Sequence, residues 1–141
     1  MSITKIISDI KNSSGQETKW SRDSIIILFF RWLSFYVTPF FILINISANI
    51  VTTFSLIFGL VTAILISFNY LFFGYAFYFI AVLLDHVDGN IARYKGESTF
   101  YGRFIDGFYG IVIVSAMQIS FAVFAAENSA YITLQWFGVL A

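Results

Sequence analysis

Long apolar stretches separated by short polar connections dominate the chain. Four of these stretches are each long enough, as a helix, to cross the roughly 30 Å of hydrocarbon in a bilayer. They are about Ile25–Ile46, Ile50–Phe68, Leu71–Ala92 and Phe104–Ala126. The pattern therefore predicts an all-α protein built from helices of membrane-spanning length.

A shorter helix is predicted at the N-terminus, where isoleucines recur at helical spacing. They are Ile3, Ile6, Ile7 and Ile10. One face of this segment is therefore apolar and the other polar, and such a helix is expected to lie on the membrane surface. The polar residues 12–18 then form a flexible link to the first long apolar stretch.

The composition indicates which solvent surrounds the chain. Of the 141 residues, 59% are apolar and 11% are charged, whereas a soluble domain carries about 45–50% apolar and about 25% charged residues. A soluble globule of this size could not bury so much apolar surface, so we expect an integral membrane protein. The eight basic and eight acidic residues cancel, and the chain has no net field to attract nucleic acid.

Cysteine and histidine usage limits the possible chemistry. The chain has no cysteine, which excludes disulfides, thiolate metal sites and cysteine nucleophiles. It has one histidine, so a metal site would be built mainly from carboxylate oxygens.

The basic residues set the expected orientation. One group lies at or before Arg31, and a second comprises Arg93, Lys95 and Arg103. Basic residues favour the cytoplasmic side, and an even number of crossings must separate two groups that share a side. Three apolar stretches lie between the groups, so one of the three is expected not to span.

The stretch Ile25–Ile46 is the best candidate for the one that does not span. It carries Arg31 inside it, Pro39 in its middle and Asn45 near its end. We therefore predict a helix in the membrane interface that is bent at Pro39. A plain first span remains the alternative.

The predicted organisation has two parts. Residues 1–48 form a cytoplasmic and interfacial N-terminal segment, and residues 49–141 form a transmembrane core with three full spans and a partial fourth. The partial fourth begins after residues 127–129, and its about 12 residues make only about 18 Å of helix, too short to cross. The core is therefore expected to be truncated, as a fragment, as half of a split protein or as a shortened homologue.

Three aspartates lie in or beside the predicted spans, where a charge costs free energy. Asp85 and Asp88 are three residues apart and share one helical face. On the next span Gly102, Asp106 and Gly110 are spaced by four and share another face. A short loop joins the two spans, so we expect antiparallel neighbours with three carboxylates converging near the cytoplasmic surface.

Converging carboxylates repel one another unless protons or cations lie between them. A divalent cation removes the repulsion, and ligation by oxygen alone favours Mg²⁺ or Mn²⁺. Gly89 and Gly102 leave room for the backbone to approach a phosphate, and Arg93 would add a positively charged fork. The alternative is structural: the two aspartates of the predicted span Leu71–Ala92 form buried ion pairs with Arg93 and Arg103 and only hold helices together.

The spacing of these residues matches a known signature. The segment from Asp85 to Arg93 reads D-H-V-D-G-N-I-A-R, eight residues separate it from Gly102, and Asp106 follows four positions later. This resembles the pattern D-x-x-D-G-x-x-A-R, eight residues, G-x-x-x-D-x-x-x-D of the CDP-alcohol phosphotransferases. Every defined position matches except the last, where Gly110 replaces aspartate.

A second segment upstream carries the same resemblance. Asn49-Ile-Val-Thr52 is similar to the P-N-x-x-T segment at the cytoplasmic start of the family's first span, with Ala48 in place of proline. The resemblance covers roughly residues 31–110. The family's interfacial helix before its first span agrees with the orientation argued above.

The resemblance implies an activity and a site. Family members transfer the phospho-alcohol group of a CDP-alcohol to an acceptor hydroxyl and release CMP, and the resemblance implies membrane-lipid substrates, a cytoplasmic active face and a homodimer. Asp85, Asp88 and Asp106 match the aspartates that hold the metal ions, Mg²⁺ or Mn²⁺, against the diphosphate. The residues implied to bind the substrate are Asn49, Thr52, Gly89, Ala92, Arg93 and Gly102.

Gly110 is the departure that bears on activity. The family's aspartate at this position shares in the metal centre and acts as general base on the acceptor hydroxyl, and glycine supplies neither function. Glu97 in the loop could swing in as a substitute, and His86 is expected to point away from the carboxylates toward a neighbouring helix. Gly110 could equally be a packing position, because small residues let membrane helices approach closely.

Two functional hypotheses therefore stay open. The first is a working CDP-alcohol phosphotransferase, and the second is a homologue that binds CDP-alcohol, or acts as a scaffold, without turnover. A channel or transporter subunit is disfavoured because the carboxylates cluster at one membrane face.

Overall fold

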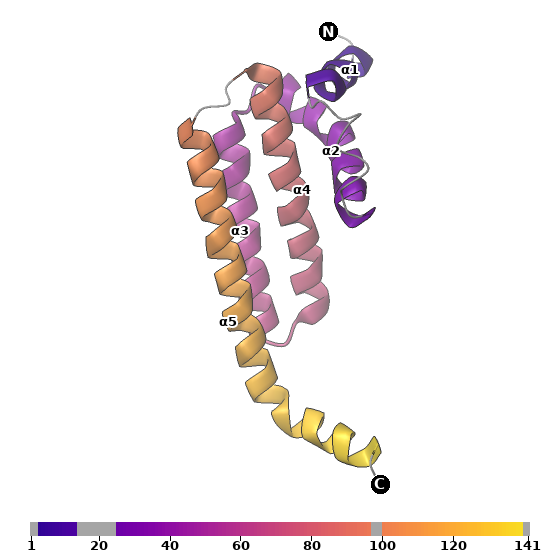
Figure 1. The fold of residues 1–141 in the computed structure, drawn as a ribbon, viewed down its shortest axis with the longest axis vertical. Coiled ribbons are helices and arrows are strands. Elements are labelled where there is room, and N and C mark those ends of the chain that lie inside the picture. The colour runs from indigo at the N-terminus through magenta and orange to yellow at the C-terminus, as the bar shows by residue number, and fades with distance from the viewer. Residues whose placement is uncertain (1–2, 14–24, 97–99, 140–141) are drawn as a thin grey trace.

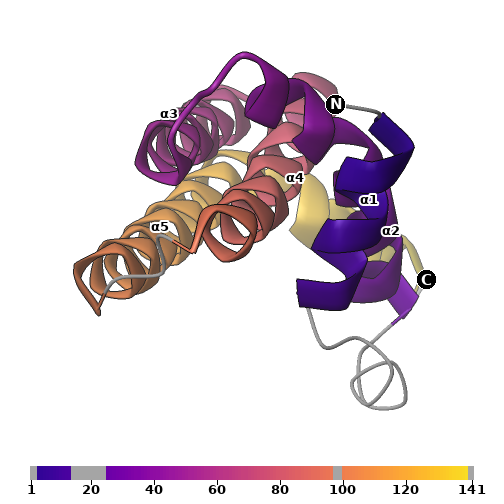
Figure 2. The ribbon, with the colours of Figure 1, turned by 90° about the horizontal axis from the view of Figure 1, so that it is seen from above.

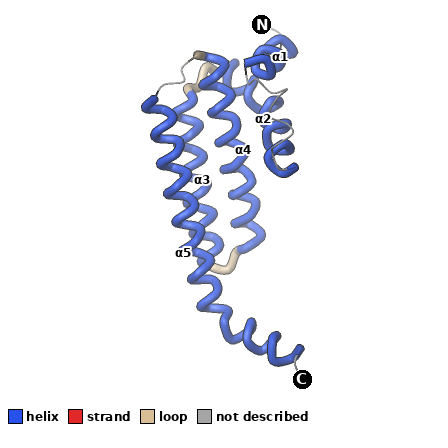
Figure 3. The backbone as a smooth tube through the Cα atoms, in the orientation of Figure 1, coloured by secondary structure: helices blue, strands red, loops and turns tan. Residues whose placement is uncertain are grey.

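The structure is entirely helical in the part of the chain that it describes. The computed structural model describes residues 3–13, 25–96 and 100–139. Side chains are described for all of these residues except 101, 103 and 130–139. The helices in these ranges (Figures 1 and 3) are α1 (Ile3–Ser13), α2 (Ile25–Leu43), α3 (Ala48–Ser67), α4 (Leu71–Lys95) and α5 (Phe100–Val139). The prediction of an all-α protein is confirmed.

Helices α3, α4 and α5 run side by side and alternate in direction (Figure 1). Helix α3 packs against both α4 and α5, and α2 packs against α4. The turn between α3 and α4 is tight because Asn69 adopts the left-handed conformation, with φ 68°, which asparagine tolerates. Among the described residues, α2, α3, α4 and most of α5 are long and apolar enough to cross a membrane. The protein is therefore an integral membrane protein, as the composition predicts.

Helix α1 packs at the end of the bundle where α4 ends (Figure 2). Ile6 and Ile10, on its predicted apolar face, are fully buried in a cluster with Phe35 of α2, and Tyr94 of α4 packs against this cluster. The Lys11 Nζ atom lies 5.9 Å from the centre of the Phe35 ring, which is a cation–π distance. The amphipathic helix is present as predicted, and part of its apolar face contacts protein.

Helix α2 lies alongside α4, with contacts that run from Phe79 to Lys95 at the end of α4. Near the start of α2, the ring centroids of Phe30 and Phe79 are 4.9 Å apart. Just beyond the end of α2, Asn45 Oδ1 accepts a hydrogen bond from Lys95 Nζ of α4 at 3.1 Å. The helix continues through Pro39, and its length and hydropathy allow it to cross a membrane. Its interfacial position and its bend at Pro39 stay predictions.

Helix α5 continues through the residues at which we predicted a break. The segment after residues 127–129 is part of α5, which bends toward its C-terminal end (Figure 1). Asn128 Nδ2 donates to the Phe124 carbonyl at 2.9 Å, and Ser129 Oγ donates to the Ala126 carbonyl at 3.0 Å. Such bonds to the preceding turn keep polar residues within a helix and often bend it. The partial fourth segment is therefore continuous with the third full span.

Helices α3 and α5 approach each other closely at Gly59. This residue is buried, and a Cβ atom there would lie 2.7 Å from Cγ1 of Ile113. We therefore expect Gly59→Ala to lower the free energy of unfolding by about 1–3 kcal/mol, measured by thermal unfolding in detergent. Gly107→Ala is the matched control, because a Cβ atom at Gly107 meets nothing within 4 Å. Equal effects of the two substitutions would contradict this account of the α3–α5 contact.

Candidate metal centre

Three carboxylates from two helices meet at one place in the bundle. Asp85 and Asp88 lie on α4 and Asp106 lies on α5, and one oxygen from each carboxylate lies within 4.8 Å of the other two. Helix α5 packs on α3, and α3 on α4, whereas α4 and α5 form no extensive contact of their own in the described ranges. The predicted convergence of the three carboxylates is thus observed, with α3 rather than direct packing holding the two helices in register.

Asp88 is the most deeply placed of the three acids. Its side chain is 5% exposed, whereas Asp85 and Asp106 are exposed. Its Oδ2 atom is buried and has no hydrogen-bond partner. Its carboxylate also interacts with the hydroxyl of Thr52 on α3. An unpartnered carboxylate oxygen is costly to bury, and a bound cation would remove that cost.

The donor set suits a hard divalent cation. An oxygen of Asp85 and an oxygen of Asp106 lie within 4.8 Å of each other, and two ionised carboxylates at that separation repel unless a proton or a cation lies between them. Together with an oxygen of Asp88, they place three oxygen ligands within 4.8 Å of one another. Oxygen is the ligand type that Mg²⁺ and Mn²⁺ prefer, so the residues present fit one such ion.

Arg93 lies near the acids but is not paired with the buried oxygen of Asp88. Its Nη2 atom donates to Asn90 Oδ1 at 2.8 Å. Its guanidinium also lies over Gly89, with Nη2 3.4 Å from the position that a Cβ atom would take there. The direct ion pair between Arg93 and Asp88 that the structural alternative requires is thus not seen in the described part of the chain, although the two charges lie near enough to attract each other. The side chain of Arg103, the other proposed ion-pair partner, lies outside the described residues.

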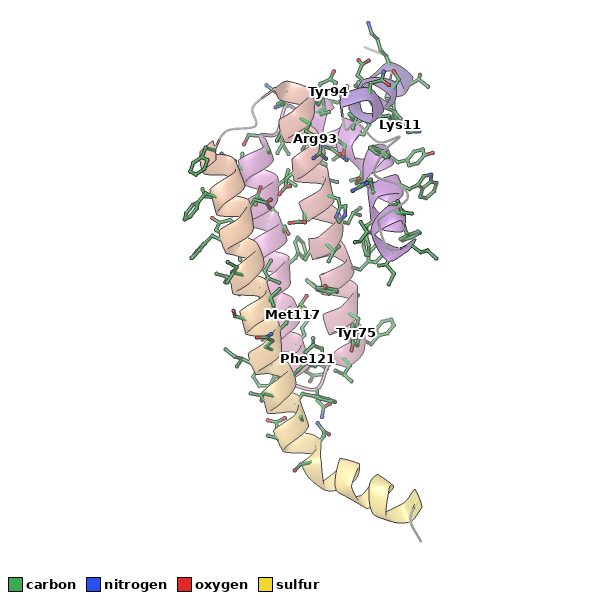
Figure 4. All side chains as sticks on the ribbon, viewed as in Figure 1. Lys11, Tyr75, Arg93, Tyr94, Met117 and Phe121 are labelled. Carbon is green, nitrogen blue, oxygen red and sulfur yellow. The ribbon has the colours of Figure 1, made fainter. Side chains whose placement is uncertain are left out.

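The remaining residues of the predicted site lie on the same three helices. Asn49 precedes Thr52 by three positions at the start of α3 and is exposed, while Ala92 of α4 and Gly102 of α5 are half-buried. In Figure 4, Arg93 lies at the same end of the bundle as Lys11 and Tyr94; the labelled residues at the other end are Tyr75, Met117 and Phe121. Substrate-binding roles for these residues stay predictions.

Gly110 follows Asp106 by one helical turn and borders open space. A Cβ atom at Gly110 would meet nothing within 4 Å, so no helix in the described part of the chain packs against this glycine, and a packing role for it stays a prediction. A carboxylate introduced there has room on the face of α5 that carries Asp106.

No other described side chain takes the place of the missing base. His86 turns to α2, as predicted: its Nδ1 contacts the Val82 carbonyl at 2.9 Å, and its ring centroid lies 6.0 Å from that of Phe30. Glu127 lies beside Asn128, which contacts the α3–α4 turn away from the acids. Glu97, the proposed substitute, lies outside the described residues.

Sequence reasoning missed two polar residues of α2. Ser34 and Thr38 are fully buried, and both accept hydrogen bonds from the Asn90 amide of α4, at 2.9 and 3.3 Å. The available signal was a pair of small hydroxyl residues four positions apart in a helix that is apolar apart from Arg31 and a few aromatic side chains with a polar atom. That signal does not say which neighbouring helix the hydroxyls face.

Fold and site together define an all-α integral membrane protein with a carboxylate cluster suited to a divalent cation. A family model described as CDP-alcohol phosphatidyltransferase matches residues 45–141, more than half of the chain. The chain therefore belongs to the CDP-alcohol phosphatidyltransferase family, as the motif resemblance indicates. Comparisons with curated proteins and with solved structures find no match.

Proposed function

We propose that the protein is a membrane CDP-alcohol phosphotransferase. In this reaction the oxygen of an acceptor hydroxyl attacks the phosphorus that bears the alcohol. The bond from this phosphorus to the CMP oxygen breaks, CMP leaves, and the hydroxyl proton passes to a base or to water. The observation that carries the proposal is the convergence of three carboxylate oxygens within 4.8 Å in a chain of this family.

The side chains at this centre have complementary proposed roles. Asp85, Asp88 and Asp106 would hold Mg²⁺ or Mn²⁺, which supplies positive charge to the diphosphate and to the departing CMP. Arg93 would bind a phosphate oxygen with its planar fork, and Gly89 leaves room for that fork. The other proposed substrate contacts are Asn49, Thr52, Ala92 and Gly102.

We assign the active face to the cytoplasm. Lys11 of α1 lies at the same end of the bundle as Arg93 (Figure 4), and Lys95 follows at the end of α4. Among the described charged residues, Glu127 lies toward the opposite end of α5. Basic residues favour the cytoplasmic side of a membrane, so the CDP-alcohol would enter from the cytoplasm. A homodimer remains a prediction from the resemblance.

A binding homologue without turnover is the second candidate. Gly110 favours this candidate, because a glycine supplies neither a general base nor a fourth carboxylate ligand. No neighbouring side chain in the described part of the chain fills the space beside it. The two candidates share the metal and nucleotide site. They differ in the rate of CMP release.

Metal dependence tests the proposed function. We expect the full chain in nanodiscs to release CMP from labelled CDP-diacylglycerol or a water-soluble CDP-alcohol, with glycerol phosphate or inositol offered as acceptor. Release should need Mg²⁺ or Mn²⁺, stop with EDTA, and return when Mg²⁺ is added in excess. Mg²⁺-dependent CDP binding without CMP release selects the second candidate. CMP release that persists in EDTA, or the absence of both release and binding, would overturn the metal site.

A further inference from the structure

A buried chain of hydrogen bonds runs from α2 to the guanidinium of Arg93. Asn90, which is 2% exposed, lies at its centre. Its Nδ2 atom donates to Ser34 Oγ at 2.9 Å and to Thr38 Oγ1 at 3.3 Å, and its Oδ1 atom accepts from Arg93 Nη2 at 2.8 Å.

The two hydroxyl groups fix the orientation of the Asn90 amide. Ser34 Oγ donates its proton to the Arg31 carbonyl at 2.8 Å, and Thr38 Oγ1 donates its proton to the Ser34 carbonyl at 2.6 Å. Each hydroxyl has one proton to donate, so toward Asn90 both oxygens act only as acceptors. The amide nitrogen must therefore face α2, and Oδ1 must face Arg93.

This orientation matters because an arginine side chain has about 2 kcal/mol of rotamer entropy to lose when it is ordered. The nearby charges of Arg31 and Asp88 act on the guanidinium of Arg93 in opposite senses, the first repelling it and the second attracting it. An acceptor held rigidly at 2.8 Å orders the guanidinium before any anion arrives. Binding of a phosphate then loses less free energy to the ordering of this side chain.

We infer that Asn90, held by Ser34 and Thr38, is a positioning residue that presents Arg93 to the diphosphate of a CDP-alcohol. This inference rests on the proposed function. Helix α2 precedes the residues 45–141 that match the family model. Through these hydrogen bonds, α2 would contribute to nucleotide binding although it lies outside the residues that match the family model.

The test uses CDP as the probe and measures its affinity for the full chain in nanodiscs with Mg²⁺. We expect Asn90→Ala to weaken CDP binding about tenfold, the effect of losing one hydrogen bond to a charged group. Ser34→Ala removes one of the two supports of the amide and should weaken binding less. In an Arg93→Ala background, Asn90→Ala should weaken binding less than about twofold further, because residues that act through one another are not additive.

The matched control is Thr62→Val. Thr62 is fully buried, and its hydroxyl donates to the Phe58 carbonyl within α3 at 3.0 Å. It should leave CDP affinity unchanged even if it lowers the unfolding temperature, which separates a general loss of packing from a loss of positioning.

The outcomes separate the two proposals. If the wild-type chain binds CDP and Asn90→Ala binds it as tightly, or if the effects of Asn90→Ala and Arg93→Ala add in full, the positioning role is overturned while the proposed function stands. If the wild-type chain fails to bind CDP with Mg²⁺, both are overturned. Should Asn90→Ala fail to fold, Ser34→Ala is compared in the wild-type chain and in the Arg93→Ala variant. The positioning role is overturned if Ser34→Ala weakens CDP binding equally in both, or in neither.

Discussion

Asp88→Asn is expected to reduce CMP release by about 10³-fold or more, because a lost metal ligand removes several kcal/mol of charge stabilisation from the transition state. Asparagine has nearly the same shape, so the packing of α3 against α4 around this position should survive. The change removes the charge of the buried Oδ2 atom, which has no hydrogen-bond partner. The measurement is CMP release from a labelled CDP-alcohol at saturating Mg²⁺.

Stability provides an independent measure of the same substitution. Without metal, the variant should unfold at the same temperature as the wild type or at a higher one, because an unpaired buried charge destabilises the folded state. With Mg²⁺, only the wild type should be stabilised, since a ligand that binds the folded state raises its stability. Asp9→Asn in α1 is the control and should leave both readouts unchanged. If Mg²⁺ stabilised Asp88→Asn as much as the wild type, Asp88 would not be a ligand.

The carboxylate cluster could be predicted from the sequence because its geometry is largely local. Helical spacing puts Asp85 and Asp88 on one face, and a short connection brings the start of α5 back to the end of α4. The connection turns at Gly96, which ends α4 in the left-handed conformation with φ 67°. The helices themselves followed from apolar runs of membrane-spanning length, since a bilayer requires internally hydrogen-bonded segments.

The contacts between helices could not be predicted in the same way. Apolar side chains on every face of a membrane helix leave no periodic stripe to show which neighbour it meets. The packing of α5 on α3 at Gly59, and of the hydroxyls of Ser34 and Thr38 on Asn90, depends on helix rotations that the sequence does not encode locally. Asn128 looked like a helix end by composition, but its side chain bonds a carbonyl of its own helix.

Gly110→Asp is expected to raise CMP release by about 10²–10⁴-fold, the usual contribution of a positioned general base. The position follows Asp106 by one turn on the same face of α5, and the added Cβ atom meets nothing within 4 Å. The new carboxylate could therefore accept the proton of the acceptor hydroxyl and add a fourth oxygen ligand beside Asp85, Asp88 and Asp106. The Mg²⁺ concentration that gives half-maximal CMP release should also fall, because the ion gains a ligand.

Gly110→Asn separates the base from simple filling of space. Asparagine matches aspartate in volume, but its amide is not a base and is a weaker ligand for Mg²⁺, so this variant should keep the wild-type rate. Equal gains from both substitutions would show that shape, and not a carboxylate, limits the reaction. No gain from Gly110→Asp would mean that the wild-type chain already takes up the proton by another route, and the second candidate function would then lose the observation that favours it. A gain confined to aspartate would make the absent carboxylate, as a base and as a fourth metal ligand, the reason for slow turnover, since the nucleotide contacts are the same in all three chains.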